Sequence, residues 1–188
     1  MRIDPELAFD HAALFGCAVL TGVGAVFNTA RLSAGSSAAV IGLGGVGLSS
    51  LLGAIAAGAR QVVAIDLSDE KLAFARELGA SETINAADPA AVEQVKDVTH
   101  GGVKYAFELA GSTRALDLAF RITRRGGTTV TAGLPPPTAT MPLVPVILVA
   151  EERTLKGSYI SSAVSALHRA LQARPDAGRS PNERHVEH

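Results

Sequence analysis

The segment that decides the fold is Ala38-Ala39-Val40-Ile41-Gly42-Leu43-Gly44-Gly45-Val46-Gly47. A short apolar run enters a glycine-rich turn with the spacing G-x-G-x-x-G, and a helical pattern of small residues follows from Leu48 to Ala59. A second apolar run, from Gln61 to Ile65, ends at Asp66, nineteen residues after Gly47. This order of strand, glycine turn, helix, strand and acid is typical of a dinucleotide-binding βαβ unit.

The residues of this unit have separate physical tasks. Gly42 allows the tight turn, and Gly44 lets the backbone approach a pyrophosphate because it has no Cβ. Gly47 allows close packing of helix on strand, and Asp66 is placed to accept hydrogen bonds from an adenosine ribose. A 2′-phosphate beside Asp66 would be repelled, and no arginine occurs in residues 67–70, so the sequence favours NAD over NADP. The alternative is a strand–turn–helix of an unrelated α/β domain, and the context on both sides of the turn argues against it.

Composition excludes several other classes of protein. The 188 residues are enough for one domain with a large core, and the net charge of −1, without a basic run that includes aromatics, argues against a nucleic-acid surface. The longest apolar stretch is rich in glycine and ends at Arg60, which argues against a membrane span. No apolar segment of a signal peptide follows Arg2. A single cysteine rules out an internal disulfide, so we expect a cytoplasmic protein.

Strands and helices are expected to alternate along the rest of the chain. Ser68 and Ser112 are predicted to cap helices at 69–78 and 112–122, and Asp88-Pro89 to open another helix that ends near Thr99. Further strands are expected at 83–85, 103–109, 128–132 and 153–160, with a Gly126-Gly127 turn and a proline-rich loop from Pro135 to Pro145. This pattern predicts an α/β fold, a Rossmann-type doubly wound parallel sheet of six strands preceded by link helices.

The predicted domain limits follow from changes in composition. Residues 1–33 contain two helical patterns, at 6–15 and 21–31, and are expected to be link helices. Residues 34–160 are predicted to form the NAD-binding domain. Residues 161–188 lose the pattern and are expected to be a divergent, disordered tail. When residues 178–188 are back-translated and read in a neighbouring frame, they resemble the sequence that follows this point in a known enzyme family. This resemblance suggests a frameshift between residues 160 and 177.

The chain resembles the zinc-containing medium-chain alcohol dehydrogenases. The similar segments occur in family order over about residues 10–160, and they are 16–26, the turn 42–47, 64–71, 107–111, 132–136 and 155–159. The resemblance implies the coenzyme-binding domain of an enzyme that transfers hydride between an alcohol or aldehyde and NAD. It also implies that the link helices lead from a catalytic domain that this sequence lacks.

The resemblance also assigns a coenzyme site. It implies a pyrophosphate turn, an adenosine-ribose acid with a nearby lysine, a residue beneath the nicotinamide and segments that flank the adenine and nicotinamide rings. Lys71 has a second interpretation, as a solvated residue one turn into a helix. The implied residues are Thr21, Gly42, Gly44, Gly45, Val46, Gly47, Asp66, Lys71, Leu109, Ala110, Ala132, Gly133 and Leu134.

Cys17 matches the one ligand of the catalytic zinc that this half of the family protein supplies. A catalytic zinc takes three protein ligands and an open position, and this sequence has no second cysteine. His11 lies six residues from Cys17, which would place the two on different faces of a helix. We therefore expect Cys17 to be an orphan ligand and a small buried thiol, with no complete catalytic set in this chain.

Three functions follow as hypotheses. The first is the coenzyme-binding portion of an NAD-dependent zinc-type alcohol dehydrogenase, inactive alone, with a glutathione-dependent formaldehyde dehydrogenase as one version. The second is a dinucleotide-binding module without turnover. The third is the partner of a separate catalytic chain. The resemblance also implies a homodimer through the strand at 153–160, whose edge is a template for pairing.

Overall fold

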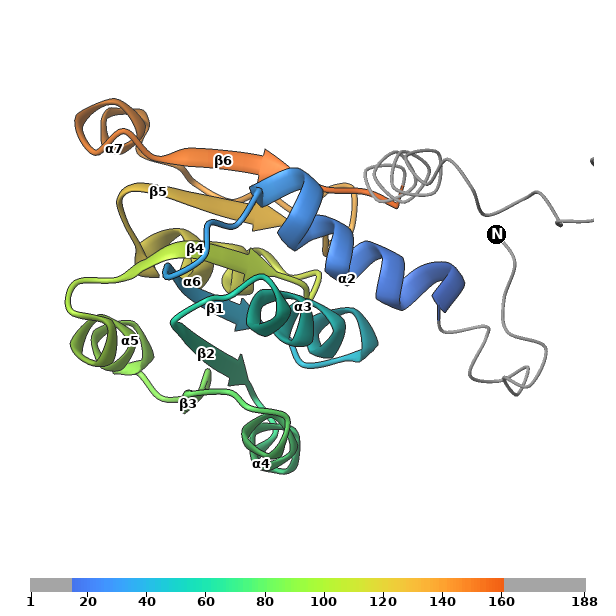
Figure 1. Cartoon of the computed structure of the whole chain (residues 1–188). Helices are drawn as coiled ribbons and strands as arrows, with labels where there is room; N and C mark the ends of the chain where they lie inside the picture. Colours follow the sequence, from blue (N-terminus) through green and yellow to red (C-terminus); the bar gives the residue numbers. More distant parts are fainter. Residues whose placement is uncertain (1–14, 161–188) are drawn as a thin grey trace, which may run out of the picture.

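Six parallel strands form the centre of the structure, a computed structural model that describes residues 15–160 (Figure 1). Their spatial order is β3-β2-β1-β4-β5-β6, which confirms the predicted doubly wound α/β fold. The strands are β1 (Ser37–Ile41), β2 (Gln61–Asp66), β3 (Glu82–Asn85), β4 (Val103–Glu108), β5 (Thr123–Thr131) and β6 (Thr154–Gly157).

Helices cover both faces of this sheet. The π-helical turns η1 (Phe15–Val19) and η2 (Ala25–Ala30) flank α2 (Leu20–Gly24), and the three run on from one another. The remaining helices are α3 (Gly45–Ala56), α4 (Asp69–Glu77), α5 (Ala91–Thr99), α6 (Thr113–Ile122) and α7 (Pro145–Ala150).

Alternating strand residues build the two halves of the core. Val40 and Phe107 point to the side where α3, α4 and η2 pack, and they share one apolar cluster with Leu51 of α3. Ile41 and Ala106 point to the opposite side, into a second cluster with α5 and α6. All five residues of β1 are buried, because both faces of a central parallel strand are covered.

The predicted helix starts at Ser68 and Ser112 are confirmed. The Ser68 hydroxyl accepts a hydrogen bond from the Lys71 N–H at 3.4 Å, and the Ser112 hydroxyl accepts one from the Ala115 N–H at 3.4 Å. Both serines have extended backbone angles, as residues at the N-cap do. These caps fix where the two helices begin beside the carboxyl ends of β2 and β4.

One helix was not predicted: α7 follows the proline-rich loop and begins at Pro145, whose fixed φ and missing N–H suit a first helical turn. Two local predictions were wrong. The Gly126-Gly127 turn lies within β5, whose pairing with β4 shifts register between Val103 and Tyr105. The break expected before Thr21 is absent, since helical geometry is continuous over residues 15–30. The helical pattern at 6–15 lies almost entirely outside the described residues.

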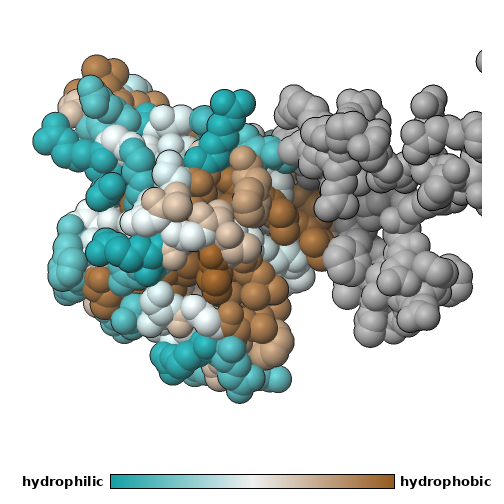
Figure 2. Space-filling view, in the orientation of Figure 1, coloured by the Kyte–Doolittle hydropathy of each residue, from teal (hydrophilic) through white to brown (hydrophobic). Residues whose placement is uncertain are grey.

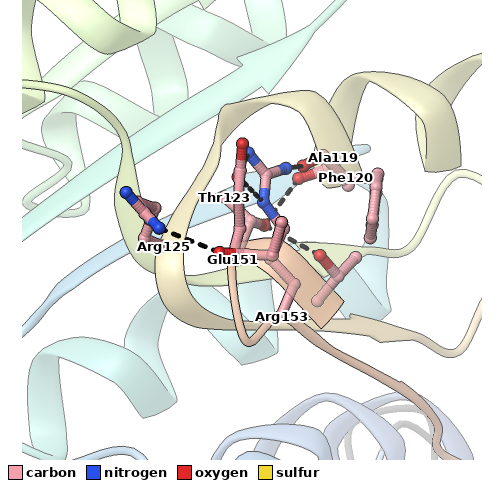
Figure 3. Close-up of polar contacts among 8 residues, drawn as sticks. Ala119, Phe120, Thr123, Arg125, Glu151 and Arg153 are labelled. Atoms are coloured by element: carbon pink, nitrogen blue, oxygen red, sulfur yellow. Dashed lines mark hydrogen bonds and ion pairs between the residues drawn. The ribbon is translucent and has the colours of Figure 1, made fainter. Parts of the chain in front are cut away.

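Two arginines, Arg125 and Arg153, connect the segment from α7 to β6 with α6 and β5 (Figure 3). The Arg153 guanidinium lies 5.1 Å from the centroid of the Phe120 ring and donates to the Phe120 carbonyl. It also pairs with the Glu151 carboxylate, with 2.6 Å from Nε to Oε2. Arg125 donates to the Ala150 carbonyl at 2.8 Å. The end of α6, the start of β5 and the turn before β6 therefore form one connected unit.

The helix layer leaves part of its apolar surface exposed. Figure 2 shows apolar surface gathered over α2 and α3 in the orientation of Figure 1. Large exposed apolar side chains include Leu52 and Ile55 of α3, Phe74 of α4 and Phe27 of η2.

The closest packing occurs where α3 meets the end of β1. A Cβ built on Gly47 would lie 1.8 Å from the Gly42 carbonyl oxygen, so α3 can start here only with glycine at that position. On the other side of α3, a Cβ on Gly22 would lie 2.3 Å from the Val46 carbonyl oxygen. The first turn of α3 is therefore held between the sheet and α2 by two close backbone contacts.

We predict that Gly47→Ala lowers the free energy of unfolding by about 1–3 kcal/mol, because overpacking forces the backbone apart. The matched control is Gly44→Ala, where a Cβ would meet no atom within 4 Å. The control should change stability by no more than about 0.5 kcal/mol. Urea unfolding of the three proteins measures the difference, and equal midpoints for both variants would contradict the packing argument.

Candidate functional site

The site lies at the carboxyl ends of the strands, beside the junction of β1 and β4. Connections from these two strands run to opposite sides of the sheet, and ligands of such sheets bind at this switch point. A cleft of about 1030 Å³ opens there. Its walls come from the turn after β1, the end of β2, the segment after β3, the loop and first turns after β4, and residues 140–142.

The glycine turn forms one wall of the cleft. Gly42 has φ +91°, and a Cβ at this residue would lie 2.7 Å from the Ala110 nitrogen, so the chain turns tightly against the loop after β4. Gly44 is the N-cap of α3 and provides no side-chain cap. The first N–H groups of a helix lack intrahelical partners, and the space above Gly44 is open. This arrangement suits an anion such as a pyrophosphate.

Asp66 ends β2 and is fixed beside the glycine turn. Its Oδ2 accepts a hydrogen bond from the Leu43 N–H at 2.6 Å, and its Oδ1 accepts one from the Ser68 N–H at 3.0 Å. The Lys71 ammonium nitrogen lies 4.0 Å from Oδ2 and is half exposed, whereas the Asp66 side chain is 11% exposed. The carboxylate and the ammonium group thus lie side by side at the edge of the cleft.

Glu108 occupies the corresponding position at the end of β4 and is 1% exposed. Its Oε1 accepts from the backbone N–H groups of Ala110 at 2.9 Å and Gly111 at 2.7 Å, and its Oε2 accepts from the Thr131 hydroxyl at 2.6 Å. Sequence analysis identified the end of this strand but not the role of Glu108. The available signal was an acid that follows an apolar strand at its carboxyl end.

Most of the residues predicted for the site gather around this cleft. Gly45, Val46 and Gly47 form the first turn of α3. The predicted residues that line the cleft itself are Gly42, Gly44, Asp66, Lys71, Leu109 and Ala110.

The four remaining predicted site residues lie outside both the cleft lining and the first turn of α3. Ala132, Gly133 and Leu134 follow β5, where a Cβ on Gly133 would lie 2.2 Å from the Gly111 nitrogen and Leu134 is 77% exposed. Thr21 lies in α2 next to Gly22, which contacts Val46 of the α3 turn. These residues border the opposite side of the glycine turn from Asp66.

Part of the cleft wall was not predicted. Residues 86–89 line it after β3, and Arg114 lines it on the first turn of α6. Neither carries a glycine motif or an acid–lysine pair, so spacing along the chain gave no signal for them.

The thiol of Cys17 is exposed, so the expectation of a buried thiol was wrong. Within residues 15–160, no group of three or more histidine, cysteine, aspartate or glutamate side chains could hold a metal ion. His11 lies outside the described residues. The described part of the chain therefore does not fit a zinc site.

No helix in the described residues is long and apolar enough to cross a membrane.

Comparisons with known proteins show which family this chain resembles. The family described as "Zinc-binding dehydrogenase" matches residues 45–173. The chain is 41% identical over 151 residues to "Alcohol dehydrogenase-like 4" of Arabidopsis thaliana, a match that covers 79% of this chain and 40% of that protein.

Solved structures of alcohol dehydrogenases are also similar to this chain. An alcohol dehydrogenase zinc-binding domain protein from Burkholderia ambifaria is 30% identical with a TM-score of 0.83, over 93% of this chain and 49% of that one. Benzyl alcohol dehydrogenase from Acinetobacter calcoaceticus is 29% identical with a TM-score of 0.82, over 92% and 49%. The chain thus spans about half the length of these relatives or less.

Proposed function

Because the chain belongs to the zinc-binding dehydrogenase family, we propose that it is the NAD-binding portion of an NAD-dependent alcohol dehydrogenase. NAD would accept hydride from an alcohol, or NADH would return it to an aldehyde. The observation that carries the proposal is the Asp66 carboxylate, fixed by the Leu43 N–H at 2.6 Å beside a glycine turn with open space above Gly44.

The adenosine half of the coenzyme would lie on the side of β2. Asp66 still has lone pairs free after accepting two backbone N–H bonds, so it can accept from ribose hydroxyls. Lys71, 4.0 Å away, can donate to the same ribose. A phosphate on the 2′-oxygen would bring its negative charge against the carboxylate, and this supports NAD over NADP.

The pyrophosphate would lie over Gly44, where the first turn of α3 provides N–H groups and the positive end of the helix dipole. The loop after β5 would then border the nicotinamide half, since the two halves of a dinucleotide bind on either side of the switch point. The loop after β4, whose Leu109 and Ala110 line the same cleft as Asp66, would lie between the two halves. These residues bind and orient the coenzyme. The substrate class, an alcohol or aldehyde, is proposed from the family resemblance, and a cytoplasmic location from the composition.

The Asp66 prediction concerns coenzyme choice. Asp66→Ala should weaken NADH binding about tenfold or more, because the ribose loses its hydrogen bonds to a charged acceptor. The ratio of NADH affinity to NADPH affinity should also fall, because the carboxylate no longer repels the 2′-phosphate. Titration calorimetry of both coenzymes measures this, with the exposed Asp97→Ala on α5 as the matched control. Wild-type protein that binds NADPH as tightly as NADH would contradict the assignment of Asp66.

A second candidate is a dinucleotide-binding module without turnover. One observation favours it for the chain alone: residues 15–160 contain no cluster of side chains that fits a metal ion, so Cys17 has no set of partner ligands within these residues. We predict substoichiometric zinc by elemental analysis and no NADH formation with primary or secondary alcohols. Stoichiometric zinc together with turnover would show that this chain is a complete enzyme, and turnover only after addition of a catalytic chain would support the partner function.

We also propose that two copies associate through β6. This strand is at the edge of the sheet, all four of its residues are exposed, and an unpaired edge is a template for a second strand. Light scattering should give the mass of a dimer, and Leu155→Lys should reduce it because like charges would face each other across the pair. Leu52→Lys on α3 is the control, and a dimer that only this control disrupts would place the contact on the helix layer instead.

A further inference from the structure

The carboxylate of Glu108 accepts hydrogen bonds from groups that belong to the site itself. Besides the N–H groups of Ala110 and Gly111, Oε1 also receives the Ser112 N–H at 3.4 Å, and Oε2 receives the Thr131 hydroxyl. A buried carboxylate is costly unless such hydrogen bonds replace its water. Here the donors come from two segments only, the loop after β4 and the end of β5.

These two segments touch each other as well as Glu108. The Glu108 carbonyl accepts from the Ala132 N–H at 3.0 Å and the Gly133 N–H at 3.3 Å. A Cβ on Gly133 would lie 2.5 Å from the Gly111 Cα and 2.9 Å from the Glu108 Oε1. The backbone and the side chain of one residue thus set the spacing between both loops.

The positions of the loops after β4 and β5 indicate which half of a bound dinucleotide each loop would border. In this strand order, Asp66 at the end of β2 marks the adenosine side, so β4 and β5 lie on the other side of the switch point. Both loops leave the carboxyl ends of these strands. The loop after β5 therefore borders the half of a dinucleotide that carries the nicotinamide. The loop after β4 lies between the two halves, because Leu109, Ala110 and Ser112 line the same cleft as Asp66.

We propose that Glu108 is a positioning residue that holds the loops at 109–112 and 131–133 as one surface for the nicotinamide half of the coenzyme. The inference rests on the proposed binding of NAD(H). It assigns Glu108 no contact with the coenzyme, and its effect passes through the backbone that its carboxylate fixes. The adenosine half is held chiefly by Asp66 and Lys71, so it should depend on Glu108 less than the nicotinamide half does.

The test compares NADH with ADP-ribose, which lacks the nicotinamide, by titration calorimetry of the whole chain. In wild-type protein NADH should bind more tightly than ADP-ribose. Glu108→Leu should weaken NADH binding about tenfold, the scale of a lost charge-assisted hydrogen bond, and should weaken ADP-ribose binding less, by about threefold at most. Glu108→Gln should retain the preference, because its carboxamide oxygen still accepts from the loop and its amide group can donate to Thr131.

Two further variants complete the design. Thr131→Val removes one donor to Glu108 and should reduce the NADH preference about threefold, which decides the question if Glu108→Leu does not fold. The exposed Glu77→Gln on α4 is the control for charge. Equal losses for NADH and ADP-ribose, or an unchanged preference in folded Glu108→Leu, would overturn the proposal. Wild-type protein that binds neither ligand would instead overturn the proposed coenzyme site.

Discussion

The close contact between α3 and the end of β1 is the constraint on which the site depends. Gly47 lies so near the Gly42 carbonyl that a single Cβ would have to displace the helix, and Gly22 limits α3 in the same way from the side of α2. Packing at this density cannot shift gradually, since neighbouring atoms have no free space to move into. The position of the first turn of α3 is therefore fixed, and so is the direction of its first N–H groups, which at a helix N-terminus can bind an anion.

Two carboxylates extend this order to the rest of the cleft. Asp66 ties the end of β2 to the glycine turn through the Leu43 N–H, and Glu108 ties the loop after β4 to Thr131 at the end of β5. The two differ in exposure, and this difference separates their tasks. Asp66 remains open to the cleft and can exchange partners with a ligand, whereas Glu108 is 1% exposed and accepts hydrogen bonds from backbone N–H groups and the Thr131 hydroxyl.

The doubly wound sheet of six parallel strands was predictable because most strands are short apolar runs between turn signals. The helix starts at Ser68 and Ser112 were predictable because serine before an apolar helical pattern is a typical N-cap. The half of the site on the glycine turn was predictable for the same reason, since residues 42–66 are contiguous. The role of Glu108 was not, because its partner Thr131 lies 23 residues away and only the parallel pairing of β4 with β5 brings them together. The exposure of Cys17 also depends on packing that no local pattern encodes.

Coenzyme binding and catalysis make different demands on such a chain. The groups proposed to bind the coenzyme are mostly backbone N–H groups, the Asp66 carboxylate and the Lys71 ammonium group, and all of them lie within residues 15–160. Zinc chemistry needs several side-chain donors that converge on one point, and these residues supply no such cluster. In the proposed function, affinity for a dinucleotide and turnover of an alcohol are therefore separate properties, because the groups for the first lie within residues 15–160 and a metal-binding cluster for the second does not.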